Sequence, residues 1–114
     1  MRVITGSAKG RKLKELQGRE TRPTTDRVKE GLFNIIQFDI EGRRVLDLFA
    51  GTGQLGIECL SRGADRCTFV DLRKEAAALI RENLTWCALQ ERAQVIQGDY
   101  LAYLTRCGEK FDLI

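Results

Sequence analysis

A glycine-rich turn is the feature of this sequence best suited to chemistry. It runs Gly51-x-Gly53-x-x-Gly56 and follows an apolar run, so we expect a strand to lead through the turn into a helix. Glycines let the chain turn sharply, and they let a ligand approach the backbone without meeting a Cβ atom. The spacing predicts a site for a nucleotide-containing cofactor, and by itself it suits NAD as well as S-adenosylmethionine.

An acidic residue, Asp47, lies at the expected end of the strand before this turn. A dinucleotide would place its pyrophosphate at the turn, where a nearby carboxylate would repel it. S-adenosylmethionine instead offers an α-ammonium and a sulfonium, and a carboxylate attracts both cations. We therefore expect Asp47 to face S-adenosylmethionine. The structural alternative is a buried acid that caps a neighbouring loop.

Two further acids follow the next two expected strands. Asp71 lies about 20 residues after Gly53, the position from which an acid accepts hydrogen bonds from ribose hydroxyls. It serves either cofactor, but it disfavours a 2′-phosphate and therefore NADP. Asp99 can accept a hydrogen bond from the adenine amine, or it can cap the helix that follows. Because ligands of open α/β sheets bind at the carboxyl ends of the strands, the three acids together predict a cofactor site.

The elements that must position these acids alternate between strand and helix. Apolar runs predict four strands, at Val45–Ala50, Arg66–Asp71, Ala93–Gln97 and Phe111–Ile114. Between them we expect three helices: one that ends near Arg62, one over Lys74–Trp86 and one over Tyr100–Arg106. A further helix should begin near Thr24, with Val28, Leu32, Ile35 and Ile36 on one face. This alternation predicts an α/β fold with a parallel, doubly wound, Rossmann-like sheet.

The N-terminal region is short, polar and basic. Residues 2–5 and 11–16 flank a glycine-bounded turn, which predicts a β-hairpin. The first 30 residues hold nine Lys or Arg and four Asp or Glu, whereas the remaining residues hold ten Lys or Arg and twelve Asp or Glu. We expect residues 1–22 to form a basic arm with an anionic partner, and residues 23–114 to form the main domain. A solvated, flexible leader is the alternative.

Bulk composition narrows the functional class. The 114 residues carry a net charge of +3, with 43% apolar and 31% charged residues, which is typical of one globular domain. No apolar run reaches the roughly 18 residues of a membrane helix and no signal peptide is evident, so we expect a cytoplasmic protein. The four cysteines form no C-x-x-C pair and histidine is absent, which disfavours zinc and excludes histidine-based catalysis. The cysteines are expected to be small buried hydrophobes.

These motifs resemble those of a known class of enzymes. The segments Asp47-Leu-Phe-Ala-Gly-Thr-Gly53, Val70-Asp71 and Gly98-Asp99 resemble the successive cofactor motifs of class I methyltransferases. Two N-terminal segments, 2–11 (RVITGSAKGR) and 21–34 (TRPTTDRVKEGLFN), are more specific and are similar to those of the bacterial RsmD family. The resemblance covers essentially the whole chain. It implies an S-adenosylmethionine-dependent enzyme that methylates the N2 amine of one guanine in small-subunit (16S) ribosomal RNA.

The resemblance also implies roles for individual positions. The cofactor would be lined by residues of the glycine turn and the strand ends, namely Asp47, Phe49, Gly51, Gly53, Asp71, Leu72, Asp99 and Tyr100. Arg22 and Thr24 would fold over the mouth of that site. Lys9, Arg11, Lys12 and Lys14 would contact phosphates of ribosomal RNA, on its own or in the small ribosomal subunit. Such contacts fix the position of a protein on the RNA without recognising the base sequence. No metal ion is implied.

The sequence departs from the RsmD family at its end. In that family the fourth strand leads into an Asp-Pro-Pro-Tyr loop that accepts the amine hydrogens and stacks the base. Here the chain ends within the fourth strand and its single proline is Pro23, so we expect an N-terminal portion that is inactive alone and leaves an open sheet edge. Three alternatives remain: an NAD-dependent oxidoreductase, a non-catalytic RNA-binding module, and a methyltransferase with another substrate.

Overall fold

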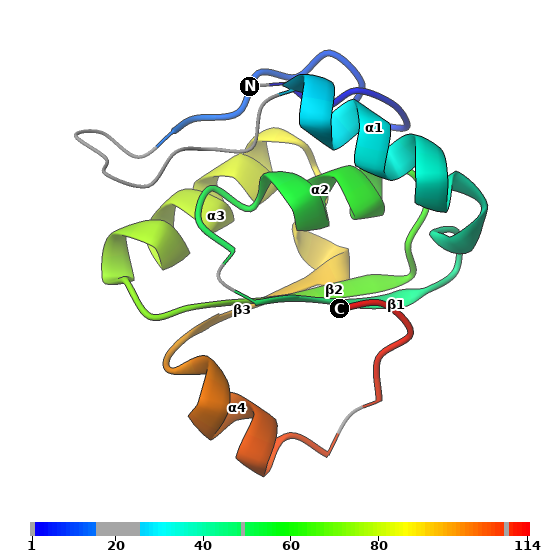
Figure 1. The fold of residues 1–114 in the computed structure, drawn as a ribbon. Coiled ribbons are helices and arrows are strands. Elements are labelled where there is room, and N and C mark those ends of the chain that lie inside the picture. Colours follow the sequence, from blue (N-terminus) through cyan, green and yellow to red (C-terminus); the bar gives the residue numbers. More distant parts are fainter. Residues whose placement is uncertain (1, 16–25, 49, 109) are drawn as a thin grey trace.

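The computed structural model describes residues 2–15, 26–48, 50–108 and 110–114 (Figure 1). Arg22, Thr24 and Phe49, together with the expected helix start at Thr24, lie outside the described residues. The described chain forms a small parallel sheet with helices on both faces, so the predicted α/β class is confirmed.

Three strands form the sheet. They are β1 (Arg44–Leu48), β2 (Arg66–Asp71) and β3 (Ala93–Gln97), and they pair in parallel in the order β1-β2-β3. The central strand β2 is buried along nearly its whole length, as an apolar strand covered on both faces should be. The register places Asp47 of β1 beside Phe69 of β2, so the carboxyl ends of the strands form a common edge.

The expected fourth strand is reduced to a single bridge. Leu113 pairs with Val45, and the Leu46 amide donates to the Leu113 carbonyl at 2.8 Å. The chain therefore returns to the side of β1 that faces away from β2. The strand order reverses at β1, which is the kind of position where open α/β sheets bind ligands.

Helices cover both faces of the sheet. The helices α1 (Asp26–Ile36), α2 (Gln54–Ser61) and α3 (Lys74–Trp86) lie on one face, and α4 (Tyr100–Arg106) lies on the other (Figure 1). Two short 3-10 turns, η1 (Gln37–Asp39) and η2 (Gln90–Arg92), follow α1 and α3. The bounds of α3 and α4 match the sequence prediction.

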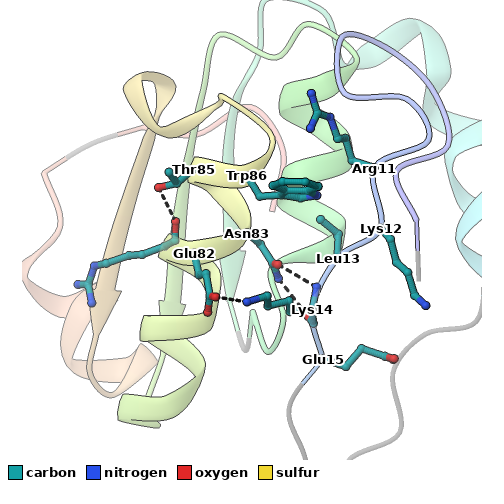
Figure 2. A pocket seen from close by; sticks show the side chains of 10 residues that line it. Arg11, Lys12, Leu13, Lys14, Glu15, Glu82, Asn83, Thr85 and Trp86 are labelled. Carbon is teal, nitrogen blue, oxygen red and sulfur yellow. Dashed lines mark hydrogen bonds and ion pairs between the residues drawn. The ribbon is translucent and has the colours of Figure 1, made fainter.

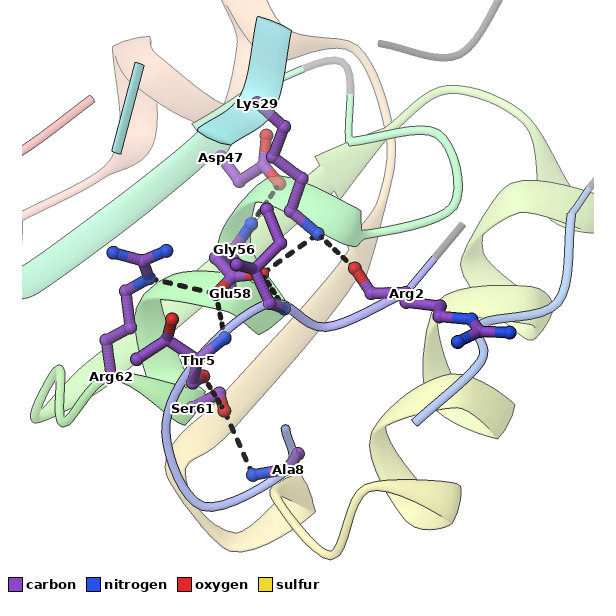
Figure 3. Close-up of polar contacts among 10 residues, drawn as sticks. Arg2, Thr5, Ala8, Lys29, Asp47, Gly56, Glu58, Ser61 and Arg62 are labelled. Carbon is purple, nitrogen blue, oxygen red and sulfur yellow. Dashed lines mark hydrogen bonds and ion pairs between the residues drawn. The ribbon is translucent and has the colours of Figure 1, made fainter. Parts of the chain in front are cut away.

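The predicted N-terminal β-hairpin is not seen. Residues 2–15 form one antiparallel bridge, between Arg2 and Lys12, and no regular strand. The Val3 amide donates to the Arg11 carbonyl at 3.0 Å, but the next backbone donors of the first segment bond to α2 instead of to a partner strand. Ile4 and Thr5 donate to Glu58 at 2.8 and 3.0 Å, and the Ala8 amide donates to the Ser61 hydroxyl at 3.0 Å (Figure 3).

This N-terminal segment nevertheless packs onto the domain. Val3, Ala8 and Leu13 are buried and belong to the same core cluster as Phe69 and Ile80. The described part of the basic arm is therefore attached to the body of the protein through apolar contacts as well as hydrogen bonds.

Helix α1 turns a different face inward from the one its apolar residues indicated. Val28, Leu32 and Ile35 are exposed, whereas Lys29 and Phe33 are buried. The Lys29 ammonium is fully buried because it pairs with Glu58 of α2 at 3.0 Å and donates to the Arg2 carbonyl at 3.0 Å (Figure 3). The Arg62 guanidinium covers the Phe33 ring, 4.7 Å from its centroid.

The cysteines behave as expected. Cys59, Cys67 and Cys87 are buried free thiols, and Cys107 is partly buried. Burial raises the pKa of Cys59 to about 12 and the pKa of Cys67 well above its ordinary value. Thiols held in this way are unreactive and serve as packing residues.

Candidate functional site

The glycine turn joins β1 to α2 in the way its spacing predicts. Gly51 and Gly53 have φ angles of 61° and 83°, in the left-handed region that disfavours other residues. Gly56 has a different role, because a Cβ atom there would lie 2.3 Å from the Phe69 ring and 2.7 Å from the Cys67 sulfur. The third glycine therefore permits close packing of α2 on β2.

Asp71 connects the end of β2 to the start of this turn. Its Oδ2 accepts a hydrogen bond from the Gly51 amide at 2.9 Å, and its Oδ1 accepts from the Arg73 amide at 2.9 Å. The Arg73 guanidinium also lies on this carboxylate, with Nε 3.3 Å from Oδ1. Burial acts to raise the pKa of Asp71, but these hydrogen bonds and the Arg73 charge outweigh it and hold the pKa below its ordinary value. Asp71 is therefore a buried anion at the start of the turn.

Asp47 holds the other end of the turn. Its Oδ2 accepts from the Gly56 amide in the first turn of α2, at 3.1 Å (Figure 3). Burial, opposed by the Gly56 hydrogen bond and reinforced by the charge of Asp71, raises the pKa of Asp47 to about 7. This contact is similar to the capping alternative that the sequence left open, although it is made to α2 and Asp47 is only partly buried. The electrostatic argument for a methyl donor is correspondingly weaker at Asp47 than the sequence indicated.

The third acid, Asp99, lies after β3 and caps α4. Its Oδ2 accepts from the Ala102 amide at 3.3 Å, and the carboxyl group remains exposed. The Gly98 amide donates to the Asp71 carbonyl at 2.9 Å, which joins the ends of β2 and β3. Leu72 and Tyr100, which follow the two strands, are both exposed at this edge.

The structure thus places the described cofactor candidates at the carboxyl ends of three neighbouring strands. Two of the three acids, Asp47 and Asp71, bond to the glycine turn itself, and Asp99 follows the adjacent strand. The exposed side chains of Leu72 and Tyr100 supply apolar surface beside them. This is the combination of carboxylates and apolar faces that an adenosine group requires.

The basic residues predicted to contact RNA separate into two groups. Arg11, Lys12 and Lys14 line an open groove of about 1210 Å³ between the N-terminal segment and α3, whereas Lys9 lies outside it (Figure 2). The Lys14 ammonium forms an ion pair with Glu82 of α3. The groove is therefore basic, but one of its cations is already partly compensated.

Sequence reasoning missed four residues that shape these sites. Glu58 and Asn83 are buried polar residues that bond to the N-terminal segment, Arg73 covers Asp71, and Trp86 lies exposed in the groove. Trp86 carried one usable signal, because it lies off the apolar stripe of α3 and is therefore expected to be exposed. Glu58 and Asn83 bond to residues of the N-terminal segment that lie more than 50 positions away in the sequence, beyond the reach of any local pattern.

Within the described ranges of residues, no group of three or more His, Cys, Asp or Glu side chains could hold a metal ion. Within the same ranges no helix has the length and apolar character needed to cross a membrane.

A Rossmann-like sheet with a glycine turn and acids at its carboxyl edge is common to dinucleotide-binding proteins and S-adenosylmethionine-dependent methyltransferases, and comparison with solved structures gives the methyltransferase class. The Escherichia coli protein yhhF superposes with a TM-score of 0.80 at 38% identity, covering 91% of this chain and 56% of that one. An O-methyltransferase from Bacillus cereus, solved in complex with SAH, shares the fold at 18% identity and a TM-score of 0.66.

Sequence comparison then identifies the family. The profile described as conserved hypothetical protein 95 matches residues 1–114, and this chain belongs to that family, the RsmD/YlbH-like rRNA methyltransferases. The Bacillus subtilis protein YlbH is 54% identical over 99 residues, covering 87% of this chain and 54% of YlbH. Ribosomal RNA small subunit methyltransferase D of Haemophilus influenzae is 45% identical over 105 residues, covering 91% of this chain and 54% of that protein. The chain thus spans about half the length of these relatives.

Proposed function

We propose that this chain is the cofactor-binding portion of an enzyme that transfers a methyl group from S-adenosylmethionine to the N2 amine of a guanine in small-subunit ribosomal RNA. The observation that carries the proposal is the set of acids and glycines at one sheet edge, in a chain that matches an rRNA methyltransferase family along its whole length. The family match favours this proposal over an NAD-dependent oxidoreductase.

The residues at the sheet edge suit the parts of the cofactor as follows. Asp71 would accept from the ribose hydroxyls, which requires the Arg73 guanidinium to move aside, and Asp99 would accept from the adenine amine. Leu72 and Tyr100 would cover the adenine ring. Gly51 and Gly53 would let the amino-acid part approach the backbone, with Asp47 nearby as a carboxylate that a bound cation would help to ionise. Phe49, Arg22 and Thr24 are proposed to complete the site.

When bound, S-adenosylmethionine supplies an electrophilic methyl group on a sulfonium. The chain would contribute by fixing the position of that group, since alignment is the main requirement of an in-line displacement. The poorly nucleophilic guanine amine would be presented by a base-holding loop of the Asp-Pro-Pro-Tyr kind, and the target base must first leave its stack. The sequence contains one proline, Pro23, and hence no such loop. We therefore propose that residues 1–114 bind the cofactor without transferring the methyl group.

Calorimetry tests the cofactor assignment. We expect S-adenosylmethionine to bind and NAD to give no heat, and we expect Asp71→Asn to weaken binding about tenfold through loss of a charge-assisted acceptor. Asp65→Asn is the matched control, because Asp65 is an exposed acid at the opposite end of β2. Binding of NAD in place of S-adenosylmethionine would overturn the assignment.

A chimera tests the proposed enzymatic activity. The chain alone, incubated with labelled S-adenosylmethionine and small-subunit ribosomal RNA, should transfer no label. Joining residues 1–114 to the part of YlbH that follows the matched region should restore transfer to a guanine N2 amine. Transfer by the chain alone would show that the base-holding loop is dispensable, and a folded chimera that binds cofactor but labels another group would contradict the proposed target.

A further inference from the structure

The groove between the N-terminal segment and α3 combines cations with an exposed aromatic ring (Figure 2). One side is formed by residues 11–15 and the other by α3. The cations that line it are Arg11, Lys12, Lys14 and Arg81, and the acids are Glu15 and Glu82. The groove thus has an excess of positive charge, which favours an anionic ligand.

Trp86 is the unusual residue of this groove. Its side chain is 57% exposed although it is the only tryptophan of the chain, and the Arg11 guanidinium lies 5.0 Å from the centroid of its ring. The buried stripe of α3 is formed by other residues, among them Ile80 and Leu84, so the core does not need this ring. Trp86 and Arg11 together present planar groups to solvent, and nucleobases stack on such groups.

Asn83 fixes the floor of the groove next to the glycine turn. Its amide oxygen accepts from the Lys14 amide at 2.9 Å, and its amide nitrogen donates to the carbonyls of Lys14 at 3.1 Å and Thr52 at 3.0 Å. Asn83 is buried, so these bonds join the N-terminal segment, α3 and the glycine turn in one rigid unit. A ligand in the groove would therefore lie beside the proposed cofactor site.

We propose that this groove binds single-stranded RNA, with one unpaired base stacked against the Arg11–Trp86 pair and a flanking phosphate held by Lys12. Aromatic and guanidinium planes that stack splayed bases, next to cations that follow the backbone, are the usual means of recognising single strands. This inference rests on the proposed function, in which RNA is the substrate. It adds a base-stacking site at Trp86 of α3 to the phosphate contacts expected of the basic arm.

The single tryptophan makes the groove directly observable. The full chain would be titrated with a mixed-sequence oligoribonucleotide of about 12 nucleotides while Trp86 emission is followed. We expect saturable quenching, with an affinity that falls as salt is raised by a slope of about 0.7 for each phosphate contacted. An RNA duplex of the same sequence should leave the emission largely unchanged. Equal quenching by the duplex, or no quenching at saturation, would overturn the stacking proposal.

Single substitutions test the contribution of the Trp86 ring separately from that of a groove cation. With a labelled oligoribonucleotide, Trp86→Leu should weaken binding about tenfold, whereas Phe38→Leu, at another exposed aromatic, should not. Lys12→Gln should lower the salt slope by about 0.7, and Arg106→Gln on α4 should leave it unchanged. Circular dichroism would verify that each variant is folded. Wild-type affinity in folded Trp86→Leu would overturn the proposal.

The same samples distinguish this inference from the proposed function. Calorimetry with S-adenosylmethionine reports on the glycine turn, and Trp86 emission reports on the groove. Cofactor binding without quenching by RNA would contradict the groove alone. Quenching by RNA without cofactor binding would contradict the proposed enzyme and leave an RNA-binding module.

Discussion

Asp47 and Asp71 hold the two ends of one glycine turn, and their pKa values move in opposite directions. Asp71 accepts from the Gly51 amide at the start of the turn, and Asp47 accepts from the Gly56 amide where α2 has begun. Arg73 neutralises Asp71 and lowers its pKa, while burial and the neighbouring Asp71 charge raise that of Asp47. The turn is therefore anchored by one permanent anion and by one acid that titrates near neutral pH.

This pair predicts an unusual dependence of stability on pH. The pKa of Asp47 rises from 3.8 to about 7 on folding, so between these values the folded state binds more protons than the unfolded state. The free energy of unfolding should therefore fall as pH rises from about 4 to 7, by about 1.4 kcal/mol for each unit of the pKa shift. Asp71 and Glu58 have lowered pKa values, so their contributions to the free energy of unfolding are lost only in more acid solution.

The substitution Asp47→Asn tests this assignment. It removes the titration and keeps an oxygen that can accept from the Gly56 amide, so the variant should be more stable than the parent at pH 8. Urea unfolding at pH 5, 6, 7 and 8 would measure the difference. An identical pH profile in both proteins would show that Asp47 does not titrate in this range.

Gly56→Ala should destabilise the domain by about 1–3 kcal/mol. The added Cβ would overlap the Phe69 ring and the Cys67 sulfur, which lie in the packed layer between α2 and β2. Gly31→Ala is the control, because a Cβ in that part of α1 meets no atom within 4 Å and should add about 0.5–1 kcal/mol through helix propensity. Thermal unfolding of the two variants should therefore shift the melting temperature in opposite directions.

Glu58→Gln should be among the most damaging single changes, at about 3–5 kcal/mol. It would leave the Lys29 ammonium fully buried without its counter-charge, 3.0 Å from the substituted group. Lys29→Met should cost less, because Glu58 would keep Arg62 at 2.9 Å and its two backbone donors. Equal losses of unfolding free energy in the two variants, measured with urea, would indicate that the buried carboxylate, and not the buried ammonium, determines the loss of stability.

Asn83→Ala should loosen the N-terminal segment as well as destabilise the domain by about 1–3 kcal/mol. The change leaves the Thr52 carbonyl and both backbone groups of Lys14 without this partner. Hydrogen exchange should increase at Lys14, and RNA affinity should fall although no charge is lost. Thr105→Ala, which removes a comparable bond to the Leu101 carbonyl on α4, should leave both properties unchanged.

Local patterns were sufficient for the elements whose partners are close in sequence. Helix α3 and strand β2 follow from their apolar periodicity and match the predicted bounds, as do β3 and α4. The carboxyl edge was also predictable, since acids that follow successive parallel strands must meet there. The direction of the Asp47 carboxylate was not, because it depends on how closely α2 approaches β1.

Long-range contacts decided the features that were predicted wrongly. The expected hairpin does not form regular strands because Glu58 accepts the amides of Ile4 and Thr5, and Ser61 accepts the amide of Ala8. The inward face of α1 is set by the ion pair of Lys29 with Glu58, which overrides the apolar stripe. Glu58, an acid between Ile57 and Cys59 in the middle of α2, was an available sign that a buried cation lay elsewhere in the chain.

The anchoring of residues 4–8 on α2 has a consequence for the order of folding. These residues leave the ribosome well before α2, because the carboxylate and hydroxyl that receive their amides are synthesised more than 50 residues later. Closing so large a loop is slow, so residues 4–8 should remain undocked until the sheet and α2 have formed. A segment made before α2 is thus expected to reach its native position after it.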